Sequence, residues 1–201
     1  TGYQFLQADS VHVDPKIRFK YPCRKPRILD DYCEIGSRGD LPFTMSSFAI
    51  KRSVLNDIGC FPLNEAMGED QDLFCRAAMH TQIAYSPSVL SFYHQDAENR
   101  ACVSNIPDEE CPFSRRLLAH VHREKPSEEL RESILSYTAA HLLHLVSLNV
   151  RSGRYDVAKE LLEDKRCKYH YTRYVWWKLR CTLLALKAAP SKLKSGNLES
   201  V

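Results

Sequence analysis

The sequence predicts an α/β fold, in which a partial mixed sheet with helices over residues 28–102 precedes an α-helical C-terminal region. Two observations lead to this prediction. Strand-like stretches occupy residues 44–50, 82–86 and 89–94 and alternate with stretches of helical spacing. From residue 107 to 187, apolar residues recur at helical spacing only. We therefore expect three regions, at 1–106, 107–189 and a frayed tail at 190–201.

The elements follow from local signals. Residues 1–27 contain three prolines and are expected to be extended and irregular. Helical spacing predicts helices at 51–58, ending before Gly59, and from residue 69, with Leu73 and Phe74 on its buried side. Pro126 and Ser127 are typical of the start of a long helix. A helical hairpin is expected to turn at Gly153.

The composition excludes several classes of function. Apolar residues make up 44% and charged residues 26% of 201 residues, which is ordinary for a globular protein. The net charge of +3 comes from basic and acidic residues in mixed order, so no nucleic-acid partner is expected. The eight cysteines form no C-x-x-C pair, which argues against zinc. With no secretory leader and no long apolar segment, we expect reduced thiols, a cytoplasmic location and at most peripheral membrane contact.

Three carboxylates crowd into the first turn of the helix expected from residue 69. Glu69, Asp70 and Asp72 can satisfy free backbone N–H groups there and suit the positive end of the helix dipole. One cap needs only one side chain, however, and like charges repel. The excess also suits a site for a cation, a hydroxyl proton or a sugar. Both interpretations stay open. The polar stretch at 93–100, which contains His94 and Arg100, likewise suits either a solvated loop or a part of the site.

The stretch MSSFAIKRSVLNDIGCFPLNEAMGEDQDLFCRAAMHTQIAYSPSVLSFYHQDAENRA carries a resemblance. Its S-S-x-x-I-K-R, I-G-x-F, G-E-D-x-D-L-x-x-R, I-A-Y and Y-H-x-D-A-x-N-R motifs stand in the order found in family 2 glycosyltransferases. Residues 28–102 are similar to the C-terminal half of the catalytic domain of these inverting enzymes, which have a GT-A fold. The resemblance implies a nucleotide-sugar donor and a glycan or lipid-linked acceptor, as in polysaccharide biosynthesis.

The resemblance also implies roles for single residues. Asp70 would be the catalytic base, and Glu69 would position the acceptor or the base. His94 would lie near a divalent metal, Mg²⁺ or Mn²⁺, or near the donor diphosphate. Four further residues would bind the acceptor or support the site, namely Asp72, Ser46, Ser47 and Arg100.

The nucleotide-binding βαβ half with its D-x-D motif, with which such enzymes begin, is missing from this sequence. We therefore expect the acceptor-side fragment of a glycosyltransferase, with a partial GT-A-type sheet and no activity on its own. Two alternatives remain. One is a non-enzymatic helical protein-interaction module formed by residues 107–187, and the other is a metal-dependent hydrolase with Asp70, Asp72 and His94 as ligands.

The segment YHYTRYVWWKLR interleaves aromatic and basic residues. This pattern suits RNA stacking or a membrane interface. In a helix, however, Tyr174, Trp177 and Cys181 share one face. Packing is therefore the favoured explanation for this segment.

Overall fold

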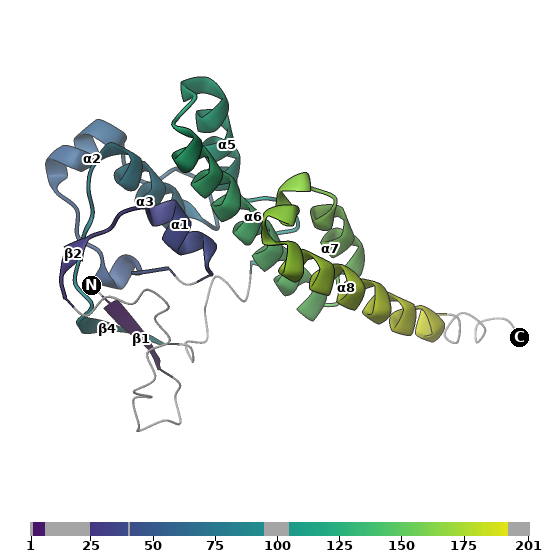
Figure 1. Ribbon diagram of the computed structural model, residues 1–201. Coiled ribbons are helices and arrows are strands. Elements are labelled where there is room, and N and C mark those ends of the chain that lie inside the picture. The colour runs from purple at the N-terminus through teal and green to yellow at the C-terminus, as the bar shows by residue number, and fades with distance from the viewer. Residues whose placement is uncertain (1, 7–24, 40, 95–104, 193–201) are drawn as a thin grey trace, which may run out of the picture.

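The computed structural model describes residues 2–6, 25–39, 41–94 and 105–192 (Figure 1). The short elements are β1 (Gly2–Leu6), β2 (Arg27–Ile28), α1 (Tyr32–Ser37), the 3₁₀ turn η1 (Met45–Ser47), α2 (Arg52–Ile58), β3 (Ala84–Tyr85) and β4 (Val89–His94). The longer helices are α3 (Glu69–His80), α5 (Pro112–Glu124), α6 (Glu128–Arg151), α7 (Tyr155–Leu162) and α8 (Tyr171–Lys192), with the 3₁₀ turn η2 (Lys165–His170) before α8.

The described part of the chain is mostly helical, so the predicted mixed sheet of GT-A type is wrong. The strands form two separate pairs. β1 lies parallel to β4, with Leu6 opposite His94, and β2 lies antiparallel to β3 over two residues each. No third strand joins either pair within the described ranges.

A stable sheet layer needs about three or more strands side by side, and the described strands form only pairs. The predicted strand at 44–50 instead begins with the 3₁₀ turn η1, in which the Ser47 hydroxyl accepts a hydrogen bond from the Thr44 N–H. The strands on either side of Pro87 do form, but each pairs with a segment from the N-terminal part of the chain and not with the other. Alternation in the sequence therefore gave strands too short and too scattered to build a layer.

The helices predicted from periodicity are confirmed. α2 ends before Gly59, and α3 starts at Glu69 and buries Leu73 and Phe74. The hydroxyl of Ser127 accepts a hydrogen bond from the Leu130 N–H and caps the start of α6. At the other end, Gly153 has φ of 74° in the turn between α6 and α7. The tail predicted from residue 190 starts inside α8, which continues to Lys192.

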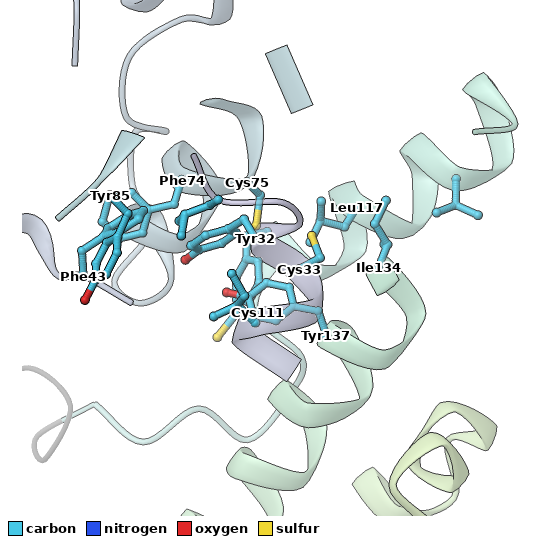
Figure 2. Close-up of a cluster of buried hydrophobic side chains, with 14 residues drawn as sticks. Tyr32, Cys33, Phe43, Phe74, Cys75, Tyr85, Cys111, Leu117, Ile134 and Tyr137 are labelled. Carbon is cyan, nitrogen blue, oxygen red and sulfur yellow. The ribbon is translucent and has the colours of Figure 1, made fainter. Parts of the chain in front are cut away.

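Two buried clusters share the long helix α6. The first, which we call the aromatic core, takes its rings from α1, α3, α5 and the segment before η1, and Figure 2 shows Tyr32, Phe43 and Phe74 close together. Tyr137 of α6 closes this core against α1. The second, the helical core, packs the C-terminal half of α6 against α7, η2 and α8 with leucine, valine and cysteine side chains and a single tryptophan, Trp177.

Candidate functional site

The site is built around the start of α3. Gly68 precedes the helix with φ of 88°, a left-handed conformation that costs other residues energy. A Cβ atom at this position would lie 2.6 Å from Cδ1 of Phe113. The close approach of α3 to α5 therefore requires a glycine here. This glycine sets the position of Glu69 and of the other carboxylates in the first turn of α3.

Asp72 is buried and neutralised, with 6% of its side chain exposed. Its Oδ2 accepts from Nε of Arg76 at 2.7 Å and its Oδ1 from Nε of Arg116 at 2.6 Å. Arg116 of α5 also donates two hydrogen bonds to the carboxylate of Glu65, at 2.6 and 2.8 Å. The hydrogen bonds to Glu65 come first among the causes that raise the pKa of Arg116. Asp72 thus serves as the centre of a structural ion network.

The same network anchors neighbouring elements. The Arg76 guanidinium donates to the backbone carbonyls at the end of α2, which belong to Ile58, Gly59 and Cys60. Arg116 brings α5 to the loop before α3 through Glu65. One buried carboxylate therefore holds α2, α3 and α5 in register.

Asp70 is in a different situation, although it lies only two residues away. Its Oδ1 accepts a hydrogen bond from the backbone N–H of Gln71 at 2.7 Å. No basic side chain of the described residues pairs with it. Burial raises the pKa of Asp70, and the neighbouring charge of Glu69 adds to this increase, while the Gln71 N–H opposes it. Asp70 is therefore a carboxylate with an increased affinity for a proton.

The backbone under Asp70 is held firmly. The side chain of Gln71 accepts a hydrogen bond from the Tyr137 hydroxyl at 3.0 Å, which links the first turn of α3 to α6. Further along α3, the Phe74 ring packs on Phe43 and Phe48, with ring centroids 4.9 and 4.8 Å apart. The carboxylates of the first turn consequently stand on a rigid helix rather than on a loop.

The other predicted site residues are not brought to Asp70 by any described contact. Ser47 accepts a hydrogen bond from the Thr44 N–H and caps η1, and Ser46 is exposed beside it. His94 ends β4 and is described by its backbone pairing alone. Arg100 lies outside the described residues.

Within the described ranges, no three His, Cys, Asp or Glu side chains are placed to hold a metal ion. Asp72 in particular has both oxygens engaged by arginines. Among the described residues, the hollow nearest to Asp70 along the chain measures about 480 Å³. It is formed by residues 64–67 and 105–112 and has Glu65, Asp108 and Glu109 in its lining.

The sequence analysis did not identify the arginines that pair with Asp72 and not with Asp70. Arg76 stands four positions after Asp72, a spacing that places both on one face of a helix, so a signal was present. Arg116 lies 44 positions away and no local pattern points to it. The six cysteines among the described residues are free thiols.

Comparisons of the chain with protein-family models, with curated proteins and with solved structures find no match.

Proposed function

We propose that this chain is the acceptor-side part of an inverting glycosyltransferase in which Asp70 is the general base. One observation supports this assignment above the others. Of two neighbouring carboxylates, Asp72 is neutralised by two arginines, while Asp70 has no cationic partner among the described residues and a raised pKa. A base needs a free lone pair and an increased proton affinity, and Asp70 combines both.

The chemistry assigned to Asp70 is a single proton transfer. The acceptor hydroxyl oxygen attacks the anomeric carbon of the sugar and forms the new C–O bond. The bond from that carbon to the nucleoside diphosphate breaks, and the diphosphate leaves with the electron pair. The hydroxyl proton passes to the Asp70 carboxylate. Glu69, whose charge favours the protonated form of Asp70, assists this step.

The hollow at residues 64–67 and 105–112 is the proposed entry for the acceptor. Its lining includes Glu65, Asp108 and Glu109, and carboxylate oxygens accept hydrogen bonds from sugar hydroxyls. Glu65 is held by Arg116, whereas Asp108 is exposed. Asp108→Asn should therefore increase the KM for the acceptor with little change in kcat.

The alternative of a metal-dependent hydrolase receives less support. It needs Asp72 as a ligand, and both Asp72 oxygens already accept hydrogen bonds from arginine. Freeing them would leave two guanidinium groups without their buried partner, which is costly.

The decisive experiment measures sugar transfer from uridine, guanosine and thymidine diphosphate sugars, in the presence of Mg²⁺ or Mn²⁺. It uses protein that carries residues 1–201 together with a donor-binding half. Asp70→Asn should reduce kcat by about 10²–10⁴-fold with donor affinity nearly unchanged, because general base catalysis acts in the chemical step. Glu69→Gln should have a smaller effect on kcat.

Asp72→Asn is the matched control, since it removes one charge from the same helical turn. Its residual activity, corrected for the folded fraction, should stay near that of the parent protein. Normal turnover in Asp70→Asn would overturn the assignment of the base.

The chain by itself should show no turnover, because the proposed donor site lies elsewhere. Titration with the same nucleotide sugars should give dissociation constants no tighter than about 1 mM. Micromolar binding by residues 1–201 would contradict this expectation.

A further inference from the structure

Helix α8 carries two apolar stripes on opposite sides. One stripe consists of Tyr174, Trp177, Cys181 and Leu184 and packs into the helical core. The other consists of Trp176, Leu179, Leu183 and Leu186, which are 49%, 62%, 59% and 65% exposed. Both repeat with a spacing of three, four and three residues. At 3.6 residues per turn, the centres of the two stripes lie about 160° apart around the helix axis.

The exposed stripe is a continuous surface and not a set of isolated apolar residues. Single exposed leucines are common on protein surfaces, but four large apolar side chains in register over three turns form a patch. Figure 1 shows α8 at one end of the molecule, with its C-terminal half extending beyond α7. A flat partner can therefore approach this helix.

The charged residues of α8 are all of one sign. α8 contains no Asp or Glu. Arg173, Arg180 and Lys187 recur every seventh position and thus line one edge of the stripe. The guanidinium of Arg180 lies over the Trp176 ring, 5.0 Å from its centroid. The exposed face of α8 consequently combines an aliphatic strip, an exposed indole and a basic border.

We propose that this face of α8 lies on the surface of an anionic lipid bilayer. Leucine side chains enter the boundary between headgroups and acyl chains, tryptophan favours that depth, and the basic border meets the lipid phosphates. Among the described helices, none is long and apolar enough to cross a membrane. α8 therefore lies along the surface, and this binding does not depend on the chemistry proposed for Asp70.

A second copy of the chain is a poorer occupant of this face. In an antiparallel pair, Arg180 and Lys187 would face basic residues of the other copy, which is unfavourable. In a parallel pair they would face Val175 and Thr182, which offer no negative charge. RNA is also a poorer occupant, because Trp176 is the only ring of the stripe and its three leucines offer no ring on which a base can stack.

The test measures partitioning of residues 1–201 onto unilamellar vesicles. Vesicles with about 30% phosphatidylglycerol in phosphatidylcholine are compared with pure phosphatidylcholine by flotation. Since each basic residue near an anionic surface strengthens binding, the anionic vesicles should bind at least about tenfold more protein. The binding should fall steeply with increasing salt. Equal binding to both vesicle types would overturn the proposal.

Matched variants test the face itself. Leu179→Glu with Leu183→Glu should abolish vesicle binding. Leu63→Glu with Leu90→Glu adds the same charge at exposed leucines 87% and 72% accessible elsewhere, and should retain binding. If both pairs bind alike, α8 is not the contact surface.

Two further comparisons probe the border and the indole. Arg180→Gln with Lys187→Gln should lose the preference for anionic vesicles, whereas Arg123→Gln with Lys51→Gln should keep it. The blue shift of tryptophan emission on binding should disappear in Trp176→Phe, because Trp177 is already buried. Sedimentation that shows a dimer unable to bind vesicles, or RNA binding that is lost in Arg180→Gln with Lys187→Gln, would instead identify a different occupant.

Discussion

The two cores that share α6 are built in different ways. The helical core joins neighbours in sequence, from Leu142 to Cys181, through a hairpin and two following helices. The aromatic core gathers residues from Leu29 to Tyr137, which approach one another only after the chain has folded. The helices of the helical core were predictable from apolar periodicity. The long-range contacts of the aromatic core were not.

The two regions also differ in how closely neighbouring atoms approach the backbone. In the aromatic core, α1 approaches α6 so closely that a Cβ atom on Gly36 would lie 2.6 Å from the Tyr137 ring. At Gly153, in the exposed turn between α6 and α7 that leads into the helical core, nothing lies within 4 Å of a Cβ atom. Residue size is thus tightly constrained at Gly36, where α1 meets α6, whereas the turn at Gly153 has room for a side chain.

The largest expected effect sharpens this comparison with one glycine from each region. Gly68→Ala should lower the free energy of unfolding by about 4 kcal/mol, since the new methyl group meets both a left-handed backbone and the Phe113 ring. Gly153→Ala, with φ of 74° but open space, should cost only about 1 kcal/mol. Denaturant unfolding measures both. Equal losses would show that the two regions are equally tolerant.

The second prediction concerns the ion network of the aromatic core. Asp72→Asn should lower the free energy of unfolding by about 3 kcal/mol, because Arg76 loses its charged partner and Arg116 keeps only Glu65. The value lies at the lower end for buried pairs, since Arg116 is partly exposed. Asp156→Asn, at an exposed ion pair with Lys159, is the control and should leave stability almost unchanged. A loss below 1 kcal/mol in Asp72→Asn would contradict the anchoring role.

The third prediction tests the junction of the two cores. His141 is buried and its Nε2 accepts a hydrogen bond from the Cys111 N–H, while burial lowers the pKa of the imidazole to about 3. The pKa of His141 in the folded state lies below its unfolded value of 6.5. Neutral His141 therefore contributes fully to stability above pH 6.5, and this contribution is lost as the pH falls. The free energy of unfolding should fall by about 2 kcal/mol between pH 7 and pH 5.

His141→Gln keeps an acceptor for the Cys111 N–H and removes the titrating group. The decrease between pH 7 and pH 5 should be smaller in this variant by the same amount. An unchanged pH dependence would show that the two cores do not depend on a neutral His141.

The smallest expected effect comes from comparing substitutions of Asp70 and Asp72, which lie in the same helical turn. The folded pKa of Asp70 is raised, so its ionised form is disfavoured and its contribution to stability decreases as the pH rises through that pKa. Asp70→Asn should therefore increase Tm at pH 7 by about 2 °C, and the difference should vanish in acid. Asp72→Asn should shift Tm in the opposite direction. A lower Tm for Asp70→Asn would assign Asp70 a structural role.

The sequence by itself determined the main helices of this protein. Apolar periodicity identified α3 and the long helices, Ser127 marked the start of α6, and Gly153 marked the turn after it. The three carboxylates were correctly placed in the first turn of α3. These features depend on residues within about one or two helical turns of each other, so a linear pattern contains them.

Only the tertiary structure decided which long-range partner each segment receives. Arg116, 44 positions away, separates the role of Asp72 from that of Asp70, and β1 rather than a neighbouring strand pairs with β4. On α8 the predicted packing face of Tyr174, Trp177 and Cys181 is confirmed, but the sequence did not show that the second stripe, with Trp176, stays exposed. Periodicity shows which residues share a face, but the face that becomes buried depends on the surfaces that the rest of the fold presents.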